Sequence, residues 1–375
     1  MTKFTPKKIA IVSEFLPHIY CGGGEIRYHQ IAKRLALRGH EVSWLCMSTE
    51  LIPEAIEGEQ INYVFLGSKV AAPPVRTVGN FLTFIISLIS HIRKSNYDLV
   101  DAQAFSPLMG AYLACIGKHT ALIGTIHDVS TNSEDEFFQF RRLARAAEAV
   151  MYRLPLKNIV TVSQSTKTSL INTYGVPGKR VHVIHNGVDL AEVNNIGTKS
   201  KQWDLIYVGR LVPHKHIDHF IETCVRTGKT GAIIGHGPLE ESIKCAVAHN
   251  PSIEFLGRLS SSSGVFAEIA RSRALILPST REGFGMVIAE ASALGVPVIA
   301  YNCGGVSEVV SHNVSGILVP PLNIQALCNA VDFILSGSNA QRMGKAGRGI
   351  VEVRFTWEHT VISLEKAYMK ALVSK

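Results

Sequence analysis

The stretch ALILPSTREGFGMVIAEASALGVPVIAY (274–301) decides the fold. It begins with an apolar run typical of a buried strand (274–279), continues with a helical pattern (284–295) and ends with a second apolar run (297–301). A strand, a helix and a strand in this order form a unit in which the two strands lie parallel.

The same alternation fills the chain in two series. In the first series we expect strands at 9–15, 41–47, 61–67, 98–103, 121–128, 158–163 and 181–186, and helices at 25–38, 78–94, 106–117, 137–154 and 164–174. The second series adds strands at 204–210, 231–237 and 253–258, and helices at about 216–226, 239–249 and 264–271. Near-continuous Val, Ile and Leu in the short runs is typical of parallel strands that are buried on both faces.

Two alternating series predict the fold class: an α/β protein with two Rossmann-like, doubly wound domains that face each other across a cleft. The segment 189–202 is polar and lacks periodicity, so we place the first domain at 1–190 and the second at 191–355. The final stretch, 356–375, has an amphipathic helical pattern and is expected to pack back on the first domain.

The composition excludes several classes of protein. At 46% hydrophobic and 18% charged residues over 375 positions, disordered, collagen-like, coiled-coil and disulfide-scaffold chains are ruled out. The seven cysteines are scattered and form no CxxC pair, which indicates reduced thiols. With no signal-peptide pattern and no apolar run of membrane-spanning length, we expect a cytoplasmic protein.

The net charge of +8 favours an anionic partner, but the sequence contains no nucleic-acid-binding motif and no long run of like charges. Residues 75–94 place a strongly apolar middle between basic ends. This segment is either a buried domain helix or an interfacial helix that docks on an anionic leaflet, helped by Arg141, Arg142 and Arg145. We expect no nucleic-acid partner, and possible contact with the cytoplasmic face of a membrane.

Three places carry residues suited to a sugar diphosphate. Gly22–Gly24 follow the first strand and enter a helix, so their amides can approach an anion, although a plain tight turn explains them equally well. Arg210 and Lys215 follow a strand of the second series, where two cations can hold a diphosphate. Glu282 and Glu290 flank the start of the helix in the opening stretch and can accept hydrogen bonds from hydroxyl groups.

Two other patterns suggest chemistry that the sequence does not support. His214, His216, Asp218 and His219 imitate a metal cluster, yet only His216 and His219 share a helix face and no distant ligand is evident. We interpret them as a solvated helix start and expect no metal site. The glycines at 22–24 also lack the spacing of the NAD-binding fingerprint.

On these residues the chain resembles the retaining glycosyltransferases of family 4, which have the GT-B fold and include mannosyl- and glucosyltransferases. The resemblance extends over nearly the whole chain. It rests on the glycine loop (22–24), HNGVD (185–189), VGRL (208–211) with Lys215, IIGHGPL (233–239), EFLGR (254–258), EGFGMVIAEA (282–291) and the C-terminal FTWEHT (355–360).

The resemblance implies roles for individual residues. Arg210 and Lys215 are similar to the family's diphosphate-binding pair, Glu290 to its ribose-binding acid, and Glu282 and His127 to the groups that face the donor sugar. The remaining donor-binding positions are Gly23, Gly24, Gly235, Leu256, Arg258, Gly283, Phe284 and Gly285. Ser163 is a candidate for the acceptor side. The family's usual glycine after the lysine is His216 here.

The activity implied is transfer of a mannosyl or glucosyl group from a GDP- or UDP-sugar to a hydroxyl of a glycan or lipid-linked acceptor, with retention by a front-face mechanism. No Asp-x-Asp motif occurs, so we expect neither a metal nor another cofactor. The alternatives are a GT-B phosphorylase, a nucleotide-sugar epimerase and a non-catalytic sugar-nucleotide-binding protein.

Overall fold

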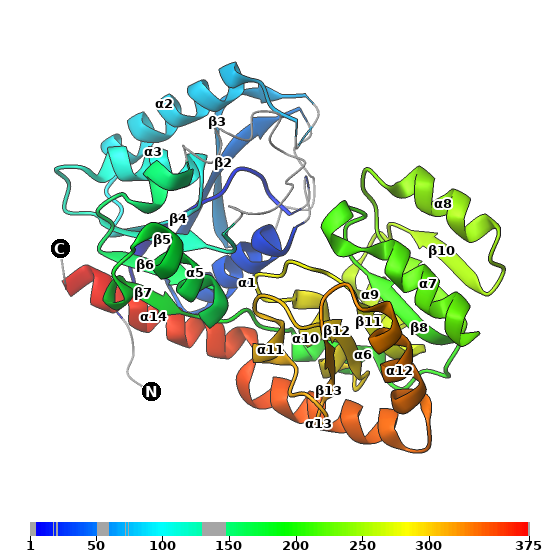
Figure 1. The fold of residues 1–375 in the computed structure, drawn as a ribbon. Helices are drawn as coiled ribbons and strands as arrows, with labels where there is room; N and C mark the ends of the chain where they lie inside the picture. The colour runs from blue at the N-terminus through cyan, green and yellow to red at the C-terminus, as the bar shows by residue number, and fades with distance from the viewer. Residues whose placement is uncertain are drawn as a thin grey trace. The chain divides into compact units, whose positions relative to one another are not determined.

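A computed structural model describes residues 5–17, 19, 22–50, 60–71, 73, 75–129 and 148–373. The chain divides into two compact units (Figure 1). Unit 1 combines the residues up to His185 with those from Trp357 onward, and unit 2 runs from Asn186 to Thr356. The division therefore falls five residues before the expected boundary at 190, and the predicted cleft stays a prediction.

The described part of unit 1 contains a seven-stranded parallel sheet in the order β3-β2-β1-β4-β5-β6-β7. Its strands are β1 (Lys8–Val12), β2 (Glu41–Thr49), β3 (Ile61–Val70), β4 (Leu99–Gln103), β5 (Ala121–Ile126), β6 (Asn158–Thr161) and β7 (Val181–Val183). The chain turns back toward β1 before pairing β4 with it, so the order of the strands reverses between β1 and β4. Open α/β sheets bind ligands at such a reversal.

Helices cover both faces of this sheet because alternate residues of its strands point to opposite sides. Ala10 and Val12 of β1 belong to a core with α2 (Val78–Lys94), α3 (Ser106–Cys115) and α5 (Gln164–Tyr174). Ile9 and Ile11 belong to a second core with α1 (Gly23–Leu37) and α14 (Trp357–Val373). Of the predicted helix at 137–154, residues 137–147 lie outside the described residues and 148–152 are helical.

The C-terminal helix α14 is part of unit 1. It packs against α1 and β5, and two of its side chains form hydrogen bonds with residues of α1's C-cap and of β4. Glu365 forms a paired ion contact with Arg38, at 2.7 and 2.8 Å. The Tyr368 hydroxyl donates to the buried carboxylate of Asp101 at 2.6 Å.

Unit 2 contains a six-stranded parallel sheet in the order β10-β9-β8-β11-β12-β13. Its strands are β8 (Trp203–Val208), β9 (Gly231–Ile234), β10 (Ile253–Gly257), β11 (Ser272–Leu277), β12 (Val298–Tyr301) and β13 (Gly316–Val319). Its helices are α6 (Leu190–Ile196), α7 (Ile217–Thr227), α8 (Glu240–Ala248), α9 (Ser262–Ala270), α10 (Met286–Ala293), α11 (Val306–Val309), α12 (Ile324–Leu335) and α13 (Asn339–Arg354). The order of the strands reverses between β8 and β11, which places a second switch point there.

The segment 189–202, where no periodicity was found in the sequence, contains a short helix. Residues 190–196 form α6, because the Asp189 carboxylate caps the helix by accepting from the amides of Ala191 and Glu192 at 3.1 and 3.2 Å. A helix this short gives too few repeats to show periodicity. Strand β13 and helices α11, α12 and α13 were also not predicted.

Candidate functional site

The residues predicted to bind the donor follow four neighbouring strands of unit 2. Arg210 and Lys215 follow β8, Gly235 follows β9, Arg258 follows β10, and Glu282 follows β11. Since all strands of this sheet are parallel, their carboxyl ends meet at one edge. The two cations and Glu282 come from β8 and β11, the strands on either side of the switch point.

Lys215 and Glu282 are in direct contact, with Lys215 Nζ donating to Glu282 Oε1. The loops that carry them are joined through their backbones: the Thr280 amide donates to the His214 carbonyl at 2.9 Å. Both side chains are largely buried, with 14% of Lys215 and 11% of Glu282 exposed. The free protein thus holds its candidate diphosphate-binding cation against its candidate sugar-binding acid.

The turn before α10 depends on glycine. Gly285 caps the helix in the left-handed region (φ 88°, ψ 63°), and a Cβ there would lie 2.9 Å from Ile288 Cδ1. The helix starts at Met286, two residues later than expected. Phe284 is buried before this turn and packs edge-on against Phe355 at 5.6 Å.

The free end of α10 suits an oxygen ligand. Ile288 and Ala289 donate to the Gly285 carbonyl, whereas no described group accepts from the amides of Met286 and Val287. Such unpaired amides at a helix N-terminus attract anionic oxygens.

Gly304 and Gly305, which the motif analysis missed, hold this turn in place. The Gly305 amide donates to the Glu282 carbonyl at 3.0 Å. A Cβ on residue 304 would lie 1.8 Å from that carbonyl oxygen, so only glycine permits this approach.

Gly235 fixes a second loop through close backbone packing. A Cβ on residue 235 would lie 1.9 Å from the carbonyl oxygen of Gly209, directly before Arg210. Leu256 is half-buried within β10, and Arg258 is exposed just after it. The close approach of residue 235 to the Gly209 carbonyl is enough to require glycine at this position, without any contact to a ligand. The donor-binding role of Gly235 stays a prediction.

Cations gather around the loop after β8. Burial lowers the pKa of His214 to about 4, and nearby Lys215, Arg281 and Arg210 add to this effect. The contribution of these three cations, unlike that of burial, favours an anion. Arg281 was not predicted from the sequence, where its position beside Glu282 is the only signal for it.

Glu290 lies in the second turn of α10 and is half-buried. Burial, followed by the Glu192 carboxylate, raises the pKa of Glu290 to about 7. No described residue forms a hydrogen bond or ion pair with its carboxylate. Its oxygens are therefore able to accept from hydroxyl groups, which is the role predicted for it.

In unit 1 the structure brings Gly24 and His127 together. Gly24 lies in the first turn of α1 beside Gly23, and His127 follows β5. A Cβ at residue 24 would lie 2.7 Å from Nε2 of Gln103 and 3.4 Å from Nε2 of His127. Gln103, which ends β4 at the switch point, was not singled out from the sequence. Cys21 lies outside the described residues.

His127 is held neutral. Burial, followed by the positive charge of Arg27, lowers the pKa of His127 to about 3. Its Nε2 atom is buried without a hydrogen-bond partner in the structure, and its ring meets Tyr28 edge-on at 5.9 Å. A neutral imidazole with an unused nitrogen can exchange hydrogen bonds with a hydroxyl group.

Other predicted positions have structural contacts. The Ser163 hydroxyl is buried and caps α5, accepting from the Thr166 amide at 3.0 Å. These contacts are those of a helix cap rather than of a ligand-binding group. Arg141, Arg142 and Arg145 lie outside the described residues.

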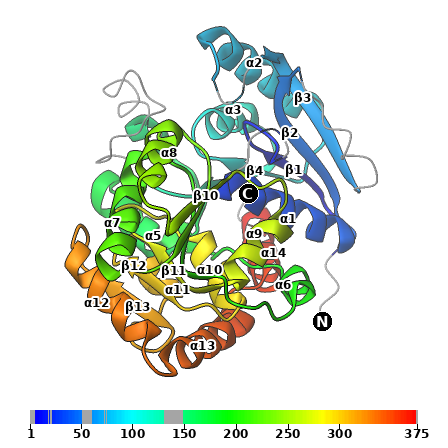
Figure 2. The ribbon, with the colours of Figure 1, turned by 90° about the vertical axis from the view of Figure 1, so that its right-hand side faces the viewer.

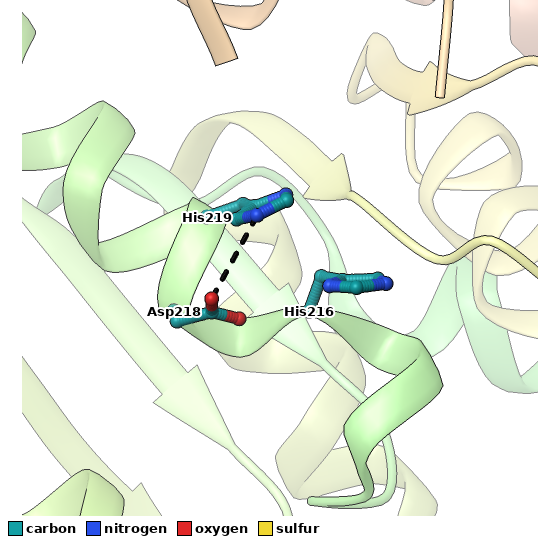
Figure 3. Close-up of side chains that lie close together, drawn as sticks. All are labelled: His216, Asp218 and His219. Carbon is teal, nitrogen blue, oxygen red and sulfur yellow. Dashed lines mark ion pairs between the residues drawn. The ribbon is translucent and has the colours of Figure 1, made fainter. Parts of the chain in front are cut away.

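Within the described ranges, the ligand atoms of His216, Asp218 and His219 lie within 4.8 Å of one another, as in a metal site (Figure 3). The two rings are stacked, 4.7 Å apart at 21°, and His219 Nδ1 is bound to the Tyr301 hydroxyl at 2.8 Å. A metal lies near the plane of each imidazole that binds it, and stacked rings have no such common position. The geometry favours the interpretation as a helix start.

His216 also takes the place where the family usually has glycine. It adopts the left-handed conformation (φ 46°, ψ 53°) that glycine adopts easily. The backbone shape is therefore kept, and stacking on His219 helps to stabilise it.

Comparisons with known proteins agree with this architecture. Residues 21–192 match the family model described as Glycosyltransferase Family 4, and residues 190–349 match the one described as Glycosyl transferases group 1. The two matches together run through most of both units.

Among curated relatives, glycogen synthase from Mycobacterium tuberculosis is 25% identical, over 97% of this chain and 95% of its own length. A GDP-mannose-dependent alpha-(1-6)-phosphatidylinositol monomannoside mannosyltransferase of the same organism is 30% identical, over 54% of this chain and 59% of its own length.

Solved structures share the fold. Sucrose-phosphate synthase from Thermosynechococcus elongatus has a TM-score of 0.84 at 20% identity, covering 98% of this chain and all of its own. Anabaena HepE in complex with UDP-glucose has a TM-score of 0.77 at 20% identity, covering 98% of this chain and all of its own.

Proposed function

Because the chain belongs to the family 4 glycosyltransferases and has their GT-B fold, we propose that it transfers a hexosyl group, mannosyl or glucosyl, from a nucleoside-diphosphate sugar to a hydroxyl group. The acceptor is a glycan or a lipid-linked molecule. The reaction retains the anomeric configuration and uses no metal.

One observation carries the proposal: the contact between Lys215 and Glu282 at the switch point of unit 2, beside the free amides of α10. A cation and unpaired amides there suit a diphosphate, and an acid beside them suits a sugar hydroxyl. Relatives named for a GDP-mannose-dependent transfer and a neighbour solved with UDP-glucose support such a donor.

In the proposed reaction the bond between the anomeric carbon and the diphosphate oxygen breaks, and the leaving nucleoside diphosphate takes the bonding electrons. Lys215 and Arg210 stabilise the negative charge that develops on it. The acceptor oxygen attacks from the same face and passes its proton to the departing phosphate oxygen. No carboxylate is assigned as a covalent nucleophile.

Donor binding should convert the Lys215–Glu282 contact into two separate interactions. The diphosphate competes for the ammonium, and the released carboxylate accepts from a sugar hydroxyl. Glu290 holds the ribose, and His127 of unit 1 contacts the sugar. Before the donor binds, the contact between Lys215 and Glu282 keeps each of these buried charges paired.

The test is a panel of GDP-, UDP- and ADP-sugars, first scored by thermal shift and then by turnover with sugar and lipid-linked acceptors. Proton NMR of the product reports the anomeric configuration. Product of inverted configuration, or a glycosyl adduct on the protein, would refute the mechanism.

The alternatives predict other outcomes from the same panel. A phosphorylase releases sugar phosphate when inorganic phosphate is supplied, an epimerase changes the donor without an acceptor, and a non-catalytic binder shows thermal shifts without turnover.

A further inference from the structure

The outer side of α2 is apolar and exposed. Val75, just before the helix, and Val78, Leu82 and Ile86 within it are 77%, 76%, 52% and 66% exposed. The last three recur every four residues and so form one line along the helix. We call this line, with exposed Leu113 of α3 and exposed Ile116 just after that helix, the α2 face.

The other side of α2 already fills the core. Phe84, Leu88 and Ile92 are completely buried in the core between α2, α3 and the sheet. Helices α2 and α3 lie side by side, with α2 outermost in unit 1 (Figures 1 and 2). The exposed line is therefore surplus to the packing of unit 1.

The chain segments that carry the α2 face contain basic but no acidic residues. No Asp or Glu occurs at residues 60–97 or 102–127, which carry five Lys and Arg. Lys69, Arg93 and Lys94 are exposed. Arg76 is instead paired with Glu14 at 2.8 Å, and Lys118 donates to the last carbonyls of α2.

Both ends of helix α2 are capped by residues of unit 1 itself. Thr77 and Asn80 form a capping box, with bonds of 3.0 and 3.1 Å between each side chain and the other's amide. At the C-terminus the Lys118 ammonium binds the carbonyls of Ile92, Arg93 and Ser95 at 2.7–2.9 Å. The apolar line is thus presented on a preformed helix.

One end of the α2 face adjoins the carboxyl edge of the unit 1 sheet. The Arg76–Glu14 ion pair links the start of α2 to the segment after β1, which leads into the glycine loop. Under the proposed function, an acceptor hydroxyl carried by a lipid near this edge would come close to the glycine loop and His127.

We propose that the α2 face docks unit 1 on the surface of an anionic lipid bilayer. The apolar line enters the boundary between head groups and acyl chains, and Lys69, Arg93 and Lys94 contact anionic head groups. The occupant is a bilayer because the face combines a narrow apolar line with exposed basic residues on segments that carry no acid, and because Glu14, an acid beside the start of α2, is already paired with Arg76. No helix in the described part of the chain combines the length and hydrophobicity that a membrane crossing requires, so the docking is peripheral.

The experiment is co-sedimentation of the full chain with vesicles of phosphatidylcholine alone or mixed with phosphatidylglycerol. We expect binding to the anionic vesicles only, weakened at ~0.5 M salt where charges are screened. The variant Leu82→Glu/Ile86→Glu should bind at least about tenfold less, because the apolar contact is lost and anions are added. Leu37→Glu/Val353→Glu, which changes two apolar residues elsewhere that are more exposed than Leu82 and Ile86, is the control and should bind as the wild type does.

Arg93→Glu/Lys94→Glu provides a second variant that leaves the apolar line intact and should also lose binding. The proposal would be overturned if the wild type stayed in the supernatant after sedimentation with anionic vesicles at low salt. So would equal binding by the Leu82→Glu/Ile86→Glu variant and its control. A lipid-free dimer that this variant converts to a monomer would identify the face as an interface between copies instead.

Failure here can be told apart from failure of the proposed function. If the docking proposal alone is wrong, nucleotide-sugar turnover with a soluble acceptor persists while vesicle binding is absent. If the proposed function alone is wrong, vesicle binding follows the predicted pattern of variants and no nucleotide sugar is turned over.

Discussion

Replacing Lys215 with methionine should separate the two roles of this side chain, one in stability and one in donor binding. Methionine keeps the aliphatic length and removes the charge, so Glu282 stays largely buried without its partner in the free protein. The variant Lys215→Met/Glu282→Gln removes both charges and should recover most of the lost stability. Neither variant should bind or transfer the donor.

The magnitude follows from the burial of the pair. Removing one partner of a buried ion pair costs about 3–5 kcal/mol, and exposed fractions of 14% and 11% place this pair near the lower end. For a unit the size of unit 2, each kcal/mol lowers Tm by about 2–4 °C. We therefore expect a loss of about 6–12 °C for Lys215→Met and recovery to within about 3 °C in the double variant.

Differential scanning calorimetry measures the transition of unit 2, and titration calorimetry with the donor selected from the panel measures binding. A Tm for Lys215→Met within about 1 °C of the wild type would refute the view that the pair is a buried, coupled charge pair. Transfer at the wild-type rate by the double variant would refute the assignment of both residues to the site.

Three further perturbations test other parts of the site. Gly235→Ala places a methyl group 1.9 Å from the Gly209 carbonyl oxygen and should sharply lower the yield of folded protein and its Tm, whereas Gly349→Ala, with open space around its Cβ, should be neutral in the same measurements. Because the pKa of Glu290 is raised to about 7, donor affinity should increase between about pH 6 and about pH 8 as the carboxylate ionises and becomes a better acceptor; a profile for Glu290→Gln that keeps this increase would assign it to another group. Transfer should continue after treatment with EDTA, and activity that is lost and then restored by Mg²⁺ would contradict the assignment of charge stabilisation to Arg210 and Lys215.

The sheets could be predicted from the sequence because buried parallel strands consist of short runs of apolar residues. The run at 204–210 became β8 and the run at 297–301 became β12. Helix α6 was not predicted, because it is too short to show a periodic pattern and depends on the cap formed by the Asp189 side chain. The number of strands in unit 2 was underestimated by one, because β13 at 316–319 was not predicted.

The candidate site could be predicted in part. Arg210, Lys215 and Glu282 stand out because polar residues directly follow apolar runs, and parallel strands end at a common edge. The roles of Gln103 and Gly304 depend on contacts with Gly24 and Glu282, far away in the chain. One sequence without aligned relatives holds no signal for such contacts, and only the folded backbone reveals them.

The place of α14 in unit 1 has a consequence for synthesis on the ribosome. Asp101 is buried in β4, and one of its hydrogen-bond donors is Tyr368 of α14, which lies 267 positions later in the chain. While the residues of α14 remain in the exit tunnel, the nascent N-terminal half lacks this donor and the apolar cover that α14 gives one face of its sheet. Domains usually finish folding in the order of synthesis, but unit 1 is begun before unit 2 and completed only after unit 2 has been made. Loss of α14 would therefore remove packing from the strands that are made first.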